Sequence, residues 1–268
     1  MAEESMTRGL KRLEHGPDAF GGAFEGAQRL FRARCLTDPV AGMLETWESC
    51  VTAMQVGSGL FASARGTGGT ETSFTWLVGH EKRELPVGAA RVAHAGRWLS
   101  AFWLALVCRE KRRVNELCEV PVSLLRGADG AFDPYMYHWV EALQAYWTRH
   151  PSFEDKLVAA VEGTDPEVLR YGDAYGVLRL MYPPMAMLTQ LALGDEARFN
   201  EELANALRLH REYWTQDEDR ELDLEGLVAL GPLALAGLAK VGGLAVTVES
   251  EYLPMALLDG EWVGEFPT

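Results

Sequence analysis

The residues of this sequence best suited to chemistry are the carboxylates that follow Trp214. Aspartate and glutamate occupy six of the nine positions from 217 to 225. Carboxylate oxygens bind hard cations, but this run lacks the regular alternation and the central glycine of a calcium-binding loop. Two other interpretations stay open, a solvated loop that starts a helix or a negatively charged face for a basic partner. The candidate partner-binding residues here are Asp217, Glu218, Asp219, Glu221 and Asp223.

Other catalytic patterns are missing from the sequence. The six histidines are scattered, with no HExxH motif, and His210 is expected to make a hydrogen bond between helices. GxSxG does not occur, and Gly66–Gly69 lacks the lysine and hydroxyl residue of a phosphate-binding loop. The four cysteines form no CxxC pair, which argues against a zinc site and a disulfide scaffold. We therefore predict no catalytic residue, no cofactor and no metal site.

Aromatic residues are concentrated in the helix predicted to begin near Tyr135. Trp139 and Tyr146 lie on one helical face and are expected in the core. Near the helix start, Tyr135, Tyr137 and His138 either join that core or form exposed anchors for a partner, since tyrosine is common at interface hot spots. These three residues are the second candidate contact surface.

Two stretches of the sequence predict the helices that hold these candidate partner-binding residues in place. Residues 187–214 read as two helices joined by a tight turn, with Gly194 ending the first helix and Asp195 capping the second. Such a pair cannot bury its apolar side alone and resembles the helix pairs of TPR proteins. Trp98–Cys108 is apolar on all sides except at Ser100, which predicts a central, buried helix.

The remaining predicted elements are mostly helices. A helix should begin at Pro39, capped by Asp38, and carry Val40, Met43 and Leu44 on its apolar side until about Arg65. The further predictions are a helix at 17–34, a strand at 74–78, a loop at 79–87 and a helix start at 165–167. We also predict a helix break or sharp kink at Pro183-Pro184, and a strand at 243–249 that could pair with 74–78.

Composition sets the limits on fold and partner class. A chain of 268 residues with 48% hydrophobic residues can bury one large core. The net charge of −14 argues against binding to nucleic acid or to anionic membranes. Residues 1–16 form a loose arm or a short helix, and residues 17–268 form a single, mainly α-helical domain with at most a small two-stranded β element. Without a signal sequence or a membrane span, we expect a cytoplasmic protein.

The C-terminal half resembles the Imm49 family, the immunity protein 49 group of bacterial polymorphic toxin systems. The resemblance rests on ALGDEARFNEELANALRLHRE, LVALGPLALAGLAK and VTVESEYLPMALL, in this order, and on the earlier RWLSAF followed by LALV. It covers roughly residues 90–258, and the N-terminal helices more loosely. It implies a mostly α-helical cytoplasmic antitoxin that binds the toxin domain encoded by the adjacent gene. It supplies no catalytic residues and does not fix the binding face or the oligomeric state.

Three hypotheses about function follow from the sequence. The first is a stoichiometric inhibitor of a cognate toxin, which the acidity suggests is basic. The second is a TPR-like adaptor that binds a peptide in the groove of an open superhelix. The third is a helical enzyme whose dispersed carboxylates bind a metal. The first is preferred because it agrees with the resemblance and needs no catalytic cluster.

Overall fold

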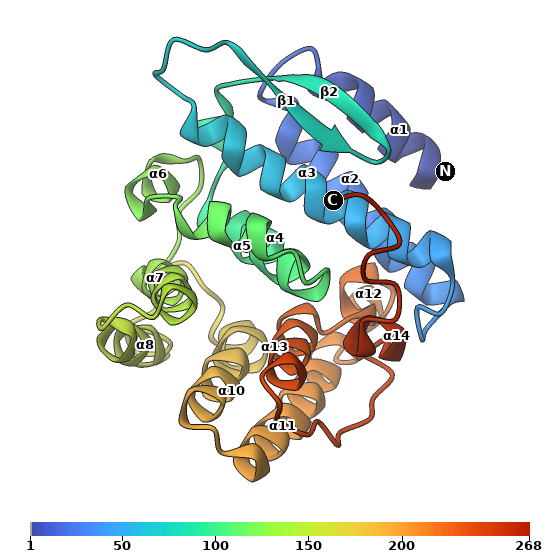
Figure 1. The fold of residues 1–268 in the computed structure, drawn as a ribbon. Helices are drawn as coiled ribbons and strands as arrows, with labels where there is room; N and C mark the ends of the chain where they lie inside the picture. The colour runs from blue at the N-terminus through green and yellow to red at the C-terminus, as the bar shows by residue number, and fades with distance from the viewer. Residues whose placement is uncertain (1) are drawn as a thin grey trace.

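The computed structural model describes residues 2–268, with side chains from residue 6 onward, and is mainly α-helical as predicted (Figure 1). The α-helices are α1 (Ala2–Leu13), α2 (Ala19–Thr37), α3 (Leu44–Arg65), α4 (Ala95–Val107), α5 (Lys111–Cys118), α6 (Val122–Gly127), α7 (Pro134–Thr148), α8 (Phe153–Glu162), α9 (Ala174–Gly176), α10 (Tyr182–Leu193), α11 (Glu196–Trp214), α12 (Glu218–Glu221), α13 (Leu230–Val241) and α14 (Met255–Asp259). The shorter elements are η1 (Ala89–Val92), η2 (Val177–Met181), η3 (Leu224–Leu227), β1 (Ser73–Val78) and β2 (Glu81–Pro86).

Helix α4 is the centre of the fold, which confirms the prediction for Trp98–Cys108. Helices α3 and α13 pack along it, and α5 and α7 contact it as well. Trp98 is fully buried, and its indole N–H donates to the Leu117 carbonyl at 3.0 Å. Because α4 is apolar all round, other helices must cover it on every side. The result is a closed body with one continuous core, not the open superhelix that the adaptor hypothesis requires.

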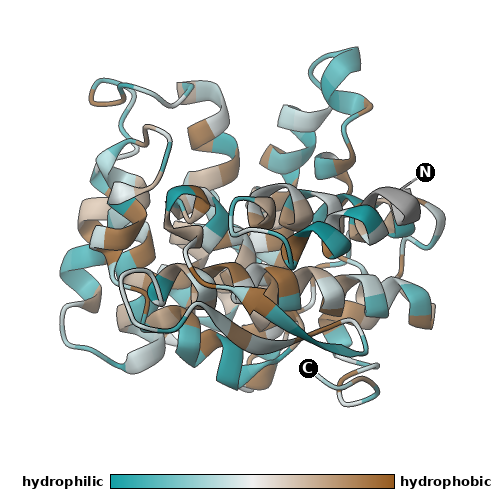
Figure 2. Cartoon of the chain, turned by 90° about the horizontal axis from the view of Figure 1, so that it is seen from above, coloured by the Kyte–Doolittle hydropathy of each residue, from teal (hydrophilic) through white to brown (hydrophobic). Residues whose placement is uncertain are grey.

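The N-terminal helices form a layer over α4. Residues 1–16 include helix α1, not a loose arm, and its Leu13 is fully buried against the layer. Helix α2 packs on both α1 and α3. Figure 2 shows hydrophobic and hydrophilic residues interleaved along the outer helices, as expected for helices with one buried side.

The sheet is a hairpin of β1 and β2, in which Phe74 pairs with Leu85. The strand prediction for 74–78 is confirmed, but the loop predicted at 79–87 is wrong, because that segment supplies β2. The strand predicted at 243–249 is also wrong. Its backbone is held by side chains of α11, with Ala245 N–H donating to Glu196 and Thr247 N–H donating to Asn200. These side-chain partners replace a neighbouring strand.

The C-terminal helix pair is α10 and α11, as predicted. Gly194 ends α10 in the left-handed conformation, with φ of 69°, and the Asp195 carboxylate accepts from the Arg198 N–H at 3.1 Å. The helical backbone is not broken at Pro183-Pro184, where we predicted a break or a sharp kink. The two prolines lie in the first turn of α10, and the π-helix η2, with its wider i→i−5 hydrogen bonding, leads directly into that turn.

The connection between α8 and α9 is irregular, so the helix start predicted at 165–167 is wrong. The buried carboxylate of Asp133 holds this connection. It accepts from the backbone N–H of Arg170 at 2.7 Å, of Tyr171 at 3.1 Å and of Gly172 at 2.7 Å. Burial alone would raise the pKa of Asp133, but these hydrogen bonds outweigh it and lower the pKa below its ordinary value.

The close packing of α3 against α2 and α4 depends on Gly57. A Cβ at this position would lie 2.6 Å from Phe24 Cε2 and 3.1 Å from Ala101 Cβ. We therefore expect Gly57→Ala to lower the free energy of unfolding by about 1–3 kcal/mol, although alanine is the better helix former. Urea denaturation measures this change.

The matched control is Gly22→Ala in α2, where an added Cβ would meet no atom within 4 Å. This exposed variant should raise the free energy of unfolding by about 0.5–1 kcal/mol, because alanine restricts the unfolded chain and favours the helix. Equal stabilisation by both variants would contradict the close packing at Gly57.

Candidate functional site

The acidic stretch, residues 217–223, lies at the surface around α12. All five predicted carboxylates in it are exposed. Asp217 caps α12 by accepting from the Arg220 N–H at 2.9 Å, and Asp223 accepts from the Glu225 N–H at 2.9 Å. Arg220 is the one basic residue of the stretch, so a net negative charge faces solvent. Leu222 lies among these carboxylates and is 75% exposed.

The second predicted surface, at the start of α7, is not a surface. Tyr135 is 4% and Tyr137 is 6% exposed, so the prediction of exposed anchors is wrong for both. Gly163, just after α8, lies over Tyr135, and the guanidinium of Arg126 stacks 4.0 Å above the Tyr137 ring. Burial raises the pKa of the Tyr135 hydroxyl to about 12. His138 is half-buried and lies 3.3 Å from a carboxylate of its own helix.

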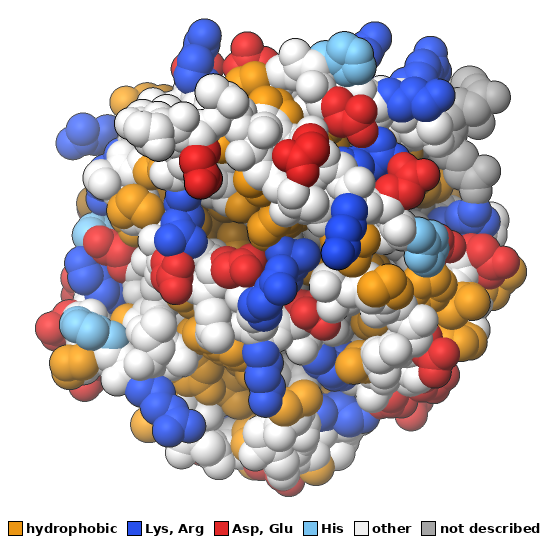
Figure 3. Space-filling view, turned by 45° about the horizontal axis from the view of Figure 1, so that its top comes forward, with side chains coloured by type: hydrophobic (Ala, Val, Ile, Leu, Met, Phe, Trp, Pro, Cys, Tyr) orange, Lys and Arg blue, Asp and Glu red, His pale blue; other side chains and the backbone are white. Residues whose placement is uncertain are grey.

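An exposed apolar surface occurs where the sequence predicted a buried helical face. We call residues 36–44, between α2 and α3, the α2–α3 corner. Leu36, Val40 and Met43 are 59, 56 and 52% exposed there, and Leu44 is also exposed. The helix begins at Leu44 and not at Pro39, so Val40 and Met43 are not part of its buried side. Figure 3 shows hydrophobic side chains gathered at the right-hand edge of the molecule, the side on which this corner lies in Figure 1.

Asp38 fixes the conformation of the corner. Its carboxylate accepts from the backbone N–H of Gly42 at 3.1 Å and of Met43 at 2.9 Å, and from the Thr46 hydroxyl at 2.7 Å. The prediction of Asp38 as the helix cap is wrong, because α3 begins five residues later than predicted, with Met43 at its N-cap, and Asp38 instead holds the turn that leads into it. At the centre of the corner, the Val40 carbonyl accepts from the Ala256 N–H at 2.9 Å. The exposed apolar side chains thus stand on a rigid backbone.

The α2–α3 corner and the acidic stretch face each other across a groove of about 300 Å³. Leu36 and Pro39 line the groove from the corner, and Arg220 and Glu221 line it from the acidic stretch. Trp214 and Tyr252 contribute further aromatic lining. The corner, the groove and the acidic stretch form what we call the acidic–apolar face. An apolar centre with a charged rim is the usual composition of a protein–protein interface.

Catalytic and metal-binding features are weak in the described part of the chain. Residues 2–268 contain no group of three or more His, Cys, Asp or Glu side chains placed to bind a metal ion. Cys50 and Cys108 are buried with their Sγ atoms 3.8 Å apart, and both are free thiols. By length and composition alone residues 224–241 could cross a membrane, but 61% of that stretch is buried, as in a core helix.

The rigidity of the corner is testable at Asp38. Burial favours the neutral carboxyl and would raise its pKa, but the hydrogen bonds from Met43, Thr46 and Gly42 outweigh this and lower it. Asp38→Asn should lower the free energy of unfolding at pH 7 by about 1–3 kcal/mol, because the amide accepts more weakly and brings its own N–H donors. Urea denaturation of both proteins gives the difference.

The pH dependence follows from the lowered pKa. The contribution of Asp38 is complete above the ordinary carboxyl pKa of about 3.9 and is lost as the pH falls through the lower pKa of the folded state. The difference between Asp38→Asn and the parent should therefore shrink at low pH. Asp18→Asn is the control, because Asp18 is exposed and makes no capping hydrogen bond. A loss at Asp18 as large as that at Asp38 would contradict this account.

Comparison with known proteins places this architecture in a family. No curated protein and no solved structure gives a significant match to the chain. The profile of one family, described as immunity protein 49, matches residues 38–257, which include the acidic stretch and most of the groove lining and of the α2–α3 corner. Because this match extends over most of the sequence, the chain belongs to the immunity protein 49 (Imm49) family.

Proposed function

We propose that this protein neutralises a cognate bacterial toxin domain by binding it stoichiometrically, without catalysing a reaction. The observation that carries the proposal is the match to the immunity protein 49 family over residues 38–257. The acidic–apolar face supports it, because this face combines exposed apolar side chains, a groove and exposed carboxylates in excess over basic residues. Immunity by binding requires a surface of this kind and no catalytic group.

The charge of the face indicates a basic partner. Five carboxylates and one arginine occupy residues 217–223, and the whole chain carries a net charge of −14. Complementary charges accelerate the encounter of two proteins and orient them as they approach. This acceleration weakens as salt increases, because the screening length is only about 8 Å at physiological ionic strength. We therefore expect a toxin domain with a basic surface, encoded by the adjacent gene and met in the cytoplasm.

The apolar corner provides the contact that keeps the partner bound. Side chains of the size of Leu36, Val40 and Met43 each contribute roughly 1.5–3 kcal/mol when an interface fully covers them. Asp38 already holds their backbone in one conformation, so little further ordering is needed on binding. In this division, the carboxylates set the association rate, and the apolar side chains set the dissociation rate.

The proposed function is tested by expressing the product of the adjacent gene with and without this protein. We expect that product to stop growth alone and to be harmless with the immunity protein, and the purified pair should form a complex of defined stoichiometry. A product that is not toxic, or one whose toxicity is unchanged by this protein, would contradict the proposal.

The division of roles is tested by charge reversal on two faces. The first variant carries Glu218→Lys, Asp219→Lys and Glu221→Lys, and leaves Asp217 in place because it caps α12. The control reverses three exposed carboxylates of α8, Glu154, Asp155 and Glu162, and so changes the net charge equally. Only the first variant should reduce the association rate by about tenfold or more at low salt, with a smaller effect at high salt.

Apolar contacts are tested in the same binding experiment. Val40→Ser together with Met43→Ser should raise the dissociation rate and leave the association rate nearly unchanged. Val158→Ser on α8 is the control, because Val158 is exposed on another helix. Surface plasmon resonance separates the two rates. If the α8 variants changed the two rates as much as the variants of the acidic–apolar face, this face would be excluded as the contact with the toxin domain.

A further inference from the structure

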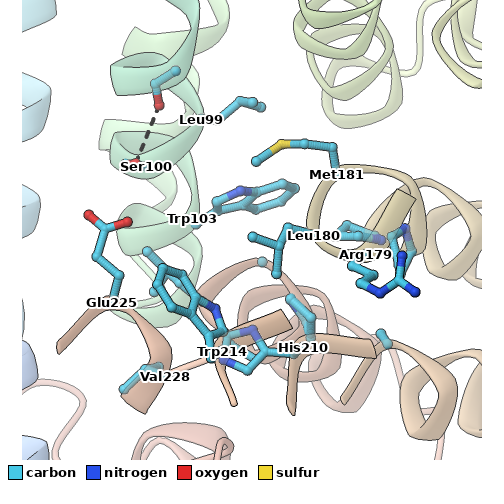
Figure 4. A pocket seen from close by; sticks show the side chains of 18 of the residues that line it. Leu99, Ser100, Trp103, Arg179, Leu180, Met181, His210, Trp214, Glu225 and Val228 are labelled. Carbon is cyan, nitrogen blue, oxygen red and sulfur yellow. Dashed lines mark hydrogen bonds between the residues drawn. The ribbon is translucent and has the colours of Figure 1, made fainter. Parts of the chain in front are cut away.

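A second pocket lies on the other side of Trp214 from the acidic–apolar groove, and Trp214 lines both. Its volume is about 190 Å³, and its lining residues come from α2, α4, α7, η2, α10, α11, η3 and the start of α13 with the segment before it. Figure 4 shows the rings of Trp103, Trp214 and His210 around this space, with Leu180 between them. Trp139 and Met181 complete the apolar lining. An engineered cavity of about 150 Å³ holds a benzene ring, so this pocket has room for one ring and a short substituent.

Three side chains that line this pocket have hydrogen-bond donors without good partners. Trp214 Nε1 and Arg179 Nε are buried and have no hydrogen-bond partner among the described residues. Only 12% of the Arg32 side chain is exposed, and its ion pair with Glu225 is long, with 3.8 Å between Nη1 and Oε1. A guanidinium has five N–H donors, so this long ion pair leaves donors of Arg32 available to a further acceptor. All three side chains line the same pocket, and an acceptor group placed there could serve them.

The electrostatics of the pocket favour an anion. Burial lowers the pKa of Arg32, and the charges of Glu225 and Asp223 oppose this shift only in part. Burial also lowers the pKa of His210 to about 4, so its ring is neutral at pH 7. The His210 Nε2–H donates to the Gly226 carbonyl at 2.8 Å and is not free for a ligand. The pocket therefore offers an under-compensated cation and apolar walls.

We propose that this pocket binds a small aromatic carboxylate. The carboxylate accepts from Arg32 at the Glu225 end of the pocket, and the ring lies among Trp103, Leu180 and Trp214. A carboxylate matches the planar fork of a guanidinium and forms stronger hydrogen bonds than a neutral acceptor. The indole walls favour an aromatic ring as the occupant of the pocket. A bound water molecule would need two to four polar partners there. This site shares only the Trp214 side chain with the groove of the acidic–apolar face.

The test is calorimetric titration of the complete protein with 3-phenylpropanoate and with 3-phenylpropanamide. The amide has nearly the same shape but no charge. For ligands of this size we expect a Kd for the carboxylate between about 10 µM and 1 mM, and binding of the amide weaker by about tenfold or more. No saturable binding of the carboxylate, or equal binding of both probes, would overturn the proposal.

Two variants and one control assign the binding to the pocket. Arg32→Gln should remove the preference for the carboxylate, whereas Arg29→Gln, on the exposed side of the same helix, should keep it. Leu180→Trp should fill the pocket and abolish binding of both probes. Because Leu180 is only half-buried, this variant should keep its melting temperature and so separates loss of the site from loss of the fold. Unchanged binding by both Arg32→Gln and Leu180→Trp would place the ligand elsewhere and overturn the proposal.

Discussion

The burial of α4 is the constraint on which the rest of the structure depends. This helix has no polar side to turn toward water, so it is stable only when other helices enclose it. Helices α3 and α13 pack along it, and α5 and α7 cover what remains. Helix α3 thereby becomes almost wholly buried itself, and the layer of α1 and α2 covers its outer side. The connections between these helices are left at the surface.

Two buried aspartates give those connections a fixed shape. Asp38 holds the α2–α3 corner, and Asp133 holds the connection before α9, in each case through backbone N–H groups. A carboxylate that accepts several such hydrogen bonds is stable in the charged form even where water is largely excluded. In the α2–α3 corner this rigidity acts on exposed apolar side chains. A pre-ordered apolar surface beside carboxylates is well suited to binding a protein partner, because little conformational entropy remains to be lost.

Local patterns in the sequence predicted most of the fold but only half of the candidate site. The α4 helix, the turn at Gly194 and Asp195, and the charge of the acidic stretch are properties of neighbouring residues, so they could be predicted. The exposure of Val40 and the burial of Tyr135 depend on segments far away in the chain, α14 in one case and α8 in the other. The pattern at 243–249 indicated an extended backbone, but could not show that its partner is α11.

The central claim is that this protein acts by covering a surface of its partner with the acidic–apolar face. Hydrogen–deuterium exchange of the immunity protein, alone and in complex with the toxin domain, tests it most directly. We predict slower amide exchange on binding in residues 36–44 and 217–227, by about tenfold or more, with unchanged exchange in α8. Protection confined to α7 and α8, with residues 36–44 and 217–227 exchanging as in the free protein, would contradict the claim.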